Sequence, residues 1–375
     1  MKELFATICL AGAIQSLFLF LVLLIKKNNR IANIYLSFYM FFVAIDMIEL
    51  YLTIKGFIFQ RPYQLSLIPY SFIFGPSMFL YISFLTAKIN TFTKKCLLLY
   101  APFVIILLIN IILYILISKS ELPQAVIIMN IIINGGGLFF EGIFYILSLI
   151  ILYKYINRLK EFFSDIDAIK LSFIRTMLIV LIFVILSIFL SFISGHNRQE
   201  YRILDVIAIL IGLGLVFGIA FFAVLQPKSL NKIYLIDNAL SHEDKISKPR
   251  YEKFRLPEIK EKEIVKQLIQ YMSEKKPYID ENLTLQSLAN QLTLSTHHLS
   301  MILNIHFNQN FYNFINSYRI DEVKQKLVNP NYNDYNILTI AFNSGFNSKS
   351  TFNSMFKKIT GMSPKEYRAN IFPKN

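Results

Sequence analysis

The sequence predicts an all-α protein, in which a bundle of seven transmembrane helices is followed by a soluble, all-helical domain. Two observations lead to this fold class. Of the 375 residues, 55% are hydrophobic and only 17% are charged, and the mean hydropathy is +0.49, which is too apolar for an ordinary soluble domain. Charge is also unevenly spread, because residues 1–225 contain 17 Lys or Arg and 10 Asp or Glu, whereas the last 150 contain 21 and 14. We therefore expect a membrane domain at 1–225, a linker at 226–261 and a soluble domain at 262–375.

Seven apolar stretches are long enough to cross a bilayer, which takes about 20 helical residues for about 30 Å of hydrocarbon. Several of them are apolar on all sides, as contact with lipid requires, and not only along one stripe. A large buried helical core is the less favoured alternative. The stretches lie at 5–25, 31–52, 66–86, 96–117, 127–153, 171–194 and 205–225.

The distribution of cations between the loops predicts the orientation of the bundle. The loops after the first, third and fifth stretches carry ten Lys or Arg, whereas the other loops carry five. By the positive-inside rule, the amino terminus then lies outside and the chain after the seventh helix lies in the cytoplasm. The outer loops are too short for a folded domain. A signal would therefore be small, lipidic, a property of the bilayer, or a partner membrane protein.

Polar residues within the predicted spans include Asn134 and Glu141, which flank a run of glycines at 135–137. Ionisable groups at membrane depth are costly and raise a functional hypothesis by default. Glycine there permits close helix approach or a local break in the helix. We take Asn134 and Glu141 as candidate intramembrane sensing residues. The alternative is that they only hold the bundle together through hydrogen bonds between helices.

A first pair of short helices is predicted at 284–304. The first helix begins near Thr284, a turn follows around Thr293, and the second helix opens at Ser295, which is a good N-cap residue. Apolar residues keep helical spacing in both helices, and two short helices across a tight turn are typical of a helix-turn-helix unit. These apolar residues are Leu285, Leu288, Ala289, Leu292, Leu299, Ile302 and Leu303.

The pattern repeats near the carboxyl terminus. Ala341 is followed four residues later by Gly345, the residue best suited to a positive φ in a turn. Phe352, Met355, Phe356 and Ile359 then follow helical spacing and predict an amphipathic helix. The opposite face would be polar, with Lys349, Ser350, Asn353, Ser354 and Lys357. Between the two units, residues 311–328 are expected to form one long connecting helix.

The second unit and the segment after it resemble a known family. The stretches Ser344-Gly-Phe, Phe352-x-x-x-Phe-Lys-Lys and Thr360-Gly-Met-Ser-Pro-Lys-Glu-Tyr-Arg are similar to the AraC/XylS-type DNA-binding domain. The likeness covers roughly residues 262–370, and Phe74-Gly-Pro-Ser-Met-Phe-Leu-Tyr extends it weakly into the membrane half. The whole chain resembles the membrane-anchored regulators of this family in Bacteroidetes-type bacteria. This implies a multi-pass protein of the bacterial cytoplasmic membrane.

The resemblance implies two recognition helices in adjacent segments of the major groove. Lys can donate to guanine, Asn can pair with adenine, and Met can contact a thymine methyl, although the first helix lacks Arg or Gln at its expected exposed positions. The implied base contacts are His297, Ser300, Met301, Asn304, Lys349, Ser350 and Ser354. The implied phosphate contacts, which position the protein without specifying sequence, are Thr296, Asn353, Lys357, Lys358 and Arg368.

The implied function is sequence-specific DNA binding in transcription regulation. The expected partners are double-stranded promoter DNA, the lipid bilayer, RNA polymerase and a second copy of the chain, and a net charge of +14 suits acidic partners. No enzyme activity and no cofactor are expected, because the sequence lacks the common catalytic motifs. No metal site is expected, since the adjacent His297 and His298 point in different directions on a helix. The alternatives are a transporter-like or channel-like protein with an accessory helix-turn-helix module, and a protein-interaction module without a DNA role.

Overall fold

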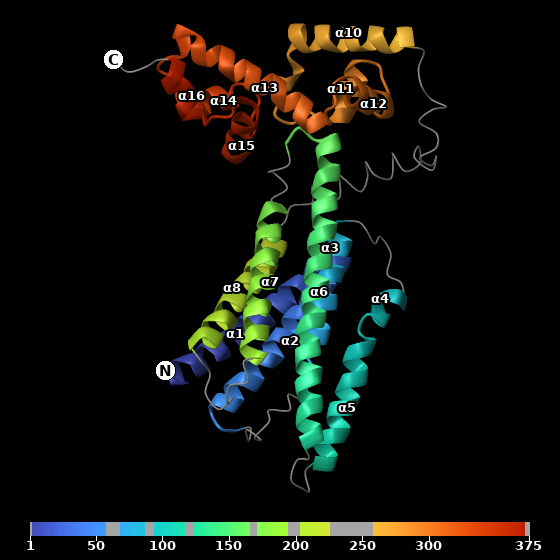
Figure 1. The fold of residues 1–375 in the computed structure, drawn as a ribbon, viewed down its shortest axis with the longest axis vertical. Helices are drawn as coiled ribbons and strands as arrows, with labels where there is room; N and C mark the ends of the chain where they lie inside the picture. The colour runs from blue at the N-terminus through green and yellow to red at the C-terminus, as the bar shows by residue number, and fades with distance from the viewer. Residues whose placement is uncertain are drawn as a thin grey trace. The chain divides into compact units, whose positions relative to one another are not determined.

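A computed structural model describes residues 2–57, 68–86, 94–117, 124–165, 171–193, 203–225 and 258–371. The chain divides into two compact units (Figure 1). The first unit comprises Met1–Tyr153 and Ser172–Asp237, and the second comprises Lys154–Leu171 and Asn238–Asn375. Within the described ranges every regular element is a helix, which confirms the all-α class. The predicted linker at 226–261 lies largely outside the described residues.

The helices before residue 226 follow the predicted apolar stretches. Among the residues that the structure describes, five helices are long and apolar enough to cross a membrane: Glu3–Ile25, Arg30–Ile54, Lys94–Ile112, Gly135–Phe162 and Phe173–Leu190. Shorter apolar helices cover Ser71–Leu85 and Ile209–Leu225, so a total of seven spans stays a prediction. The full bounds are α1 Lys2–Ile25, α2 Arg30–Ile54, α3 Ser71–Leu85, α4 Lys94–Leu98, α5 Ala101–Ile117, α6 Gln124–Phe162, α7 Leu171–Ile193 and α8 Ile203–Leu225.

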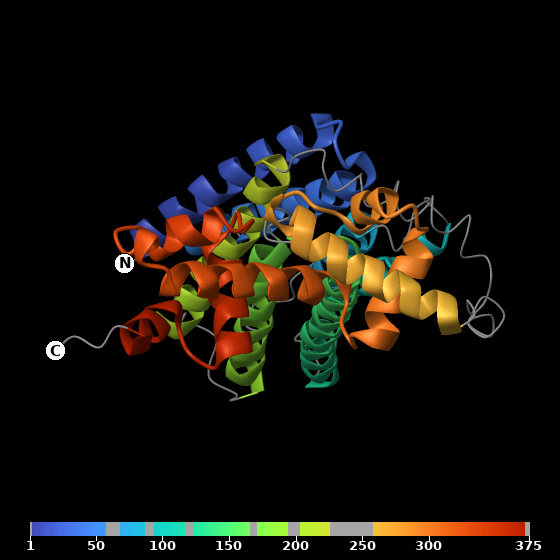
Figure 2. The ribbon, with the colours of Figure 1, turned by 90° about the horizontal axis from the view of Figure 1, so that it is seen from above.

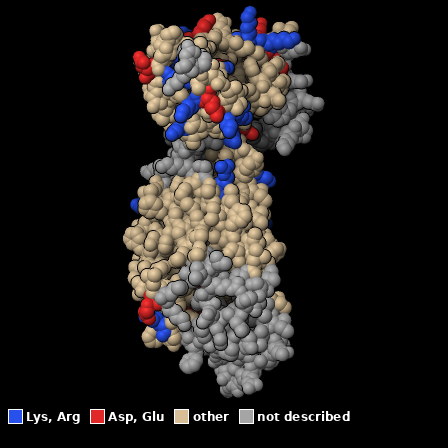
Figure 3. Space-filling model, turned by 60° about the vertical axis from the view of Figure 1, so that its left-hand side comes forward, with Lys and Arg blue, Asp and Glu red and all other residues tan. Residues whose placement is uncertain are grey.

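The outward surface of the first unit is apolar. On α1 alone, Leu4, Ile14, Phe18, Leu21 and Ile25 are between 55% and 77% exposed. A soluble monomer rarely exposes an apolar patch of this kind. On the face drawn in Figure 3, Lys, Arg, Asp and Glu gather over the second unit, and the described surface of the first is almost free of them. The exposed apolar side chains and the length of these helices suggest that the protein is associated with a membrane.

The second unit is organised around one long helix, α13. Figures 1 and 2 show α10, α11 and α12 around its N-terminal half, and Figure 1 shows α14, α15 and α16 around its C-terminal half. The α13 bounds, Phe311–Val328, match the predicted connecting helix. The other bounds are α10 Glu258–Lys275, α11 Leu285–Gln291, α12 Thr296–His306, α14 Ile337–Phe342, α15 Lys349–Thr360 and α16 Pro364–Ile371, with short 3₁₀ turns η4 Pro277–Ile279 and η5 Pro330–Tyr332.

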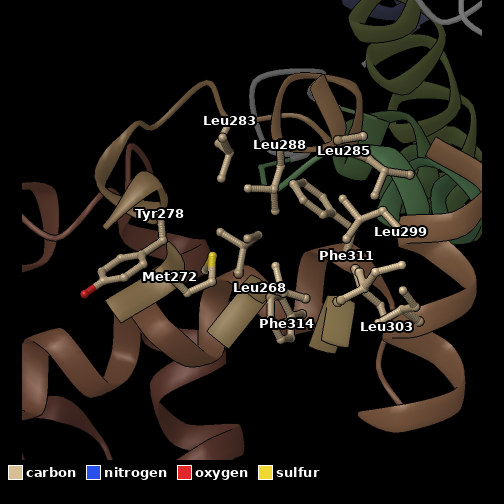
Figure 4. Close-up of a cluster of buried hydrophobic side chains, with 14 residues drawn as sticks. Leu268, Met272, Tyr278, Leu283, Leu285, Leu288, Leu299, Leu303, Phe311 and Phe314 are labelled. Carbon is tan, nitrogen blue, oxygen red and sulfur yellow. The ribbon is translucent and has the colours of Figure 1, made fainter. Parts of the chain in front are cut away.

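Two apolar cores lie along α13, one at each half. The N-terminal core joins Leu268 and Met272 of α10, Phe311 and Phe314 of α13, and the leucines of α11 and α12 in one cluster (Figure 4). The C-terminal core joins Val323 of α13 to the apolar face of α15. Phe352, Met355 and Phe356 are buried as predicted, whereas Ile359, in the last turn of α15, is 41% exposed.

Candidate nucleic-acid interface

Side-chain caps fix both helices of the first pair. Thr284 caps α11 in a reciprocal capping box, in which its hydroxyl accepts from the Ser287 N–H at 3.1 Å and Ser287 Oγ accepts from the Thr284 N–H at 3.0 Å. Ser295 caps α12, since its hydroxyl accepts from the His298 N–H at 3.2 Å. Thr293 adopts a left-handed conformation in the turn between them. The predicted starts of both helices and the position of the turn are therefore confirmed.

The second pair has the same construction. Ser348 caps α15 by accepting from the Thr351 N–H at 3.3 Å. Gly345, in the turn before it, has a φ of +95°, as predicted. A Cβ on this residue would lie 2.2 Å from the carbonyl oxygen of Tyr278. The turn between α14 and α15 is thus built against the chain that precedes the first pair, and only glycine fits there.

The exposed side of α15 forms a continuous polar and basic surface. Its N-terminal end carries Lys349 and Ser350. Lys357 and Lys358 lie in its last turn, where a positive charge interacts favourably with the helix dipole. All of these side chains are exposed, in contrast to the buried Phe352 and Phe356 on the other side. We call this surface the polar face of α15, and its members are Lys349, Ser350, Asn353, Ser354, Lys357 and Lys358. Lys358 Nζ also donates to Asn313 Oδ1 at 3.1 Å.

The predicted contacts on α12 are only partly accessible. Asn304 is exposed, and His297 and Ser300 are half-buried. Met301 and Thr296 are buried, with 3% and 6% of their surface exposed. The expected exposed position of Met301 is therefore wrong. The physical reason is that α12 packs against α10, α11 and α13, so more than one side of this helix faces the protein.

Arg368 binds carbonyl groups of its own unit. Its Nη1 donates to the Tyr335 carbonyl at 2.8 Å, and its Nη2 donates to the carbonyls of Tyr332, at 3.3 Å, and Asn333. The guanidinium thereby ties α16 to the segment that begins with η5. A phosphate contact by Arg368 stays a prediction, and it would compete with these three acceptors.

Sequence reasoning missed a buried polar centre on α13. The Arg319 side chain is only 1% exposed, and its Nε donates to the Tyr278 carbonyl at 2.7 Å and its Nη2 to the Asp280 carbonyl at 2.8 Å. Its guanidinium lies 5.8 Å from the ring centroid of Phe346, directly after Gly345. Burial lowers the pKa of Arg319 to about 10, with Asp165 and Asp280 acting in the opposite direction. The group therefore remains a cation at neutral pH.

One turn further along α13, Glu322 joins both halves of the second unit. Its carboxylate accepts from Lys276 at 2.9 Å and from the Tyr278 hydroxyl at 3.1 Å, and it pairs with Lys326 at 3.3 Å. Lys326 in turn donates to the Asn343 carbonyl at 2.9 Å, just after α14. Burial opposes ionisation of Glu322, but the hydrogen bond from Lys276 and the charge of Lys326 outweigh it, so the pKa lies below its ordinary value.

In the first unit, Glu141 lines a cavity of about 310 Å³. Its Oε1 accepts from the Tyr145 hydroxyl at 2.8 Å, and that hydroxyl is hydrogen-bonded to Tyr39 at 2.9 Å. Asp46 lines the same cavity. Beside it, a Cβ on Gly75 would lie 3.0 Å from the Glu141 Cα, so a glycine of α3 permits close approach to α6. The side chain of Asn134 lies outside the described residues.

Known proteins match part of the chain. Residues 288–370 match a family described as a helix-turn-helix domain. Two proteins of Staphylococcus aureus, from strains COL and N315, are each named an uncharacterized HTH-type transcriptional regulator and are 33% identical over 93 residues. The C-terminal part of the chain therefore carries an AraC-type helix-turn-helix domain.

The aligned region is a small part of these relatives. The match covers 25% of this chain and 12% of each relative. A solved structure of a protein of unknown function from Listeria innocua is 24% identical over 28% of this chain and 96% of its own, and its TM-score of 0.26 is too low to support an inference.

Proposed function

We propose that this chain is a membrane-bound transcription regulator that binds specific DNA sequences through its second unit. The observation that carries the proposal is the polar face of α15, which is exposed, rich in Lys, Ser and Asn, and lies within the residues that match a helix-turn-helix family. These side chains suit DNA, because Lys can donate to guanine and to phosphate and Asn can pair with adenine. The names of the Staphylococcus relatives, regulators of transcription, support the same function.

In this proposal α15 and α12 are the two recognition helices. Lys349, Ser350 and Ser354 contact base edges, while Asn353, Lys357 and Lys358 contact phosphates. His297, Ser300 and Asn304 are the accessible base contacts that remain on α12. One chain with two such helices could occupy successive major-groove segments about 34 Å apart, as dimers of single helix-turn-helix proteins do.

The apolar helices of the first unit would hold the regulator in the bacterial cytoplasmic membrane. The proposed topology has the amino terminus outside and the DNA-binding unit in the cytoplasm, and it is supported by the excess of Lys and Arg in the loops after the odd-numbered spans. The bilayer, promoter DNA, RNA polymerase and a second copy of the chain are the proposed partners. A membrane-bound pair would have a raised effective concentration on paired sites.

We further propose that the cavity beside Glu141 receives the signal. It combines Glu141 and Asp46 with the aromatic side chains of Tyr39, Tyr70 and Tyr145, and its volume of about 310 Å³ is at the lower end of the range for small-molecule sites. The described residues that line it include no Lys, Arg or His. Carboxylates among aromatic rings suit a small amphiphile with a cationic or hydrogen-bond-donating head.

DNA binding is tested by two lysine variants of the full chain in lipid nanodiscs. Lys349→Ala should change the preferred bases, because this side chain lies at the base-reading end of α15. Lys357→Ala should weaken binding to all sequences alike and lower the salt dependence by about one phosphate contact. The measurement is affinity for a library of duplexes at several salt concentrations.

Lys266→Ala is the matched control. Lys266 is exposed on α10, outside both helix pairs, so its removal should leave base preference and salt dependence unchanged. If Lys349→Ala and Lys357→Ala lose the same affinity with no change in preference, the assignment of the polar face of α15 is wrong. If the wild-type chain has no salt-dependent affinity for any duplex, the second unit is a protein-interaction module.

A further inference from the structure

The chain that leaves α6 is built into the DNA-binding unit. Residues 162–165, here called the junction segment, end α6 and belong to the second unit. Phe162 packs against the N-terminal core, and Phe163 forms an isolated antiparallel β-bridge with Thr284, the cap of α11. Before them, Lys160 Nζ lies 6.0 Å from the ring centroid of Tyr312 on α13. The segment thus contacts both the first helix pair and the connecting helix.

Ser164 is the centre of this contact and is only 1% exposed. Its hydroxyl donates to the Leu283 carbonyl at 2.7 Å, and its N–H donates to the same oxygen at 3.4 Å. Its own carbonyl accepts from Asn316 Nδ2 at 2.9 Å and from Arg319 Nη1 at 3.4 Å, and its Oγ accepts from Arg319 Nη2 at 3.1 Å. The N–H, the carbonyl and the hydroxyl of Ser164 are therefore all hydrogen-bonded to other parts of the second unit.

Ser164 also completes the hydrogen bonds of a buried cation. Five hydrogen bonds hold the Arg319 guanidinium: two go to Ser164, and the others go to Tyr278, Asp280 and Asn316. A buried charged donor that loses its acceptors is costly. Without the junction segment, Arg319 would have to move or admit water, and it touches both the chain before α11 and, at Phe346, the turn before α15.

The junction segment is covalently continuous with the longest helix of the chain. With 39 residues, α6 is about 58 Å long, well beyond the hydrocarbon thickness of about 30 Å. The same helix carries Glu141 of the cavity. A shift or rotation of α6 would therefore act on Ser164 directly, without passing through residues 226–257.

We propose that the junction segment is an internal partner of the DNA-binding unit, and that its seating on Arg319 and Asn316 holds the two helix pairs in the arrangement that binds DNA. This rests on the proposed function. Fixing the two pairs in advance lowers the ordering cost of binding two groove segments. Release of Ser164 frees Arg319 and loosens that arrangement, so α6 controls DNA affinity.

The contact between the junction segment and the DNA-binding unit can be tested without DNA, by a cysteine pair across the β-bridge. Bridge partners have Cβ atoms about 4.5–5.5 Å apart, close to disulfide geometry. In a full chain carrying Cys9→Ser and Cys96→Ser, Phe163→Cys with Thr284→Cys should cross-link in native membranes under copper phenanthroline. Phe163→Cys with Asn290→Cys, an exposed position on α11, should not. Equal cross-linking of both pairs, or of neither, would overturn the seating.

Control of DNA affinity is tested with Ser164→Ala in nanodiscs. Loss of the hydroxyl removes its bonds to Arg319 and Leu283, and the affinity for a duplex selected by the wild-type chain should fall about tenfold. Ser317→Ala is the matched control, because the hydrogen bond that the described structure gives this hydroxyl stays within α13, to the Phe314 carbonyl. It should bind within about twofold of wild type, since one such bond within a helix is worth little.

Two further results separate the possible failures. If Ser164→Ala binds DNA as tightly as Ser317→Ala, the control of DNA affinity by the junction segment is refuted. The cysteine pair gives a second measurement that does not depend on Ser164→Ala folding, since the oxidised and cross-linked chain should bind at least as tightly as the reduced chain. If the cross-link forms but neither the reduced nor the cross-linked chain binds any duplex, the proposed function fails, whereas the contact of the junction segment is upheld.

Discussion

Gly345 satisfies two requirements that only glycine can meet together. Its φ of +95° lies in the left-handed region, and a Cβ would stand 2.2 Å from the Tyr278 carbonyl and 2.9 Å from Arg319 Nε. The second atom belongs to the buried guanidinium that Ser164 also binds. At this one position the second helix pair, the connecting helix and the chain before the first pair come into contact.

Gly345→Ala should therefore destabilise the second unit by about 2–4 kcal/mol, through backbone strain and overpacking together. Gly361→Ala is the matched control, because Gly361 also has a positive φ of +77° but nothing lies within 4 Å of an added Cβ. Gly361→Ala should destabilise the second unit by only about 1 kcal/mol, because it adds backbone strain without overpacking. Hydrogen exchange of α11 to α15 in the full chain measures both, and equal losses would contradict the packing described for Gly345.

At the scale of the elements, the sequence predicts the helices that have both a cap and an apolar stripe. The pattern around Thr284 and Ser295 places α11 and α12, and the stripe from Phe311 places α13 to the residue. Caps and periodicity are local, so they can be recognised without knowledge of the fold. The same periodicity predicts the face of α15 opposite Phe352 and Phe356, and that face is exposed.

Features that depend on tertiary packing could not be predicted. The basic stretch after Tyr153 looks like a loop, yet α6 continues to Phe162 because Leu159 is buried in its continuation. Periodicity cannot distinguish a helix covered on one side from one covered on several, so it predicts an exposed Met301 where the packing of α12 buries it. Arg319 looks like a solvent-exposed cation until the carbonyls that bind it are brought together.

The cavity is formed between elements, and two isosteric changes test its role. Glu141→Gln or Asp46→Asn in living cells should shift the output of a reporter promoter at least about threefold at equal protein level, because the charge offered to a ligand is lost. Glu3→Gln should not, since Glu3 is exposed, pairs with Lys55 at 2.5 Å and does not line the cavity. Reporter output that is identical in all three variants would exclude the cavity as the signal site.

At the scale of the whole molecule, two kinds of surface are joined in one chain. The first unit exposes apolar side chains on α1 and offers five helices of membrane-spanning length, and the second unit exposes the polar face of α15. Residues 288–370 of the second unit match a helix-turn-helix family. A regulator built in this way would search only the DNA that comes near the bilayer, so its sites must be found with the membrane attached.

The most direct measurement is mapping of the DNA that co-purifies with the full chain from washed, formaldehyde-crosslinked membranes of its host. We predict discrete enriched sites that share a sequence motif, with altered sites for Lys349→Ala. Absence of enriched sites in the membrane fraction, or enrichment only with a soluble fragment released from it, would contradict the claim that this is a membrane-bound DNA-binding regulator.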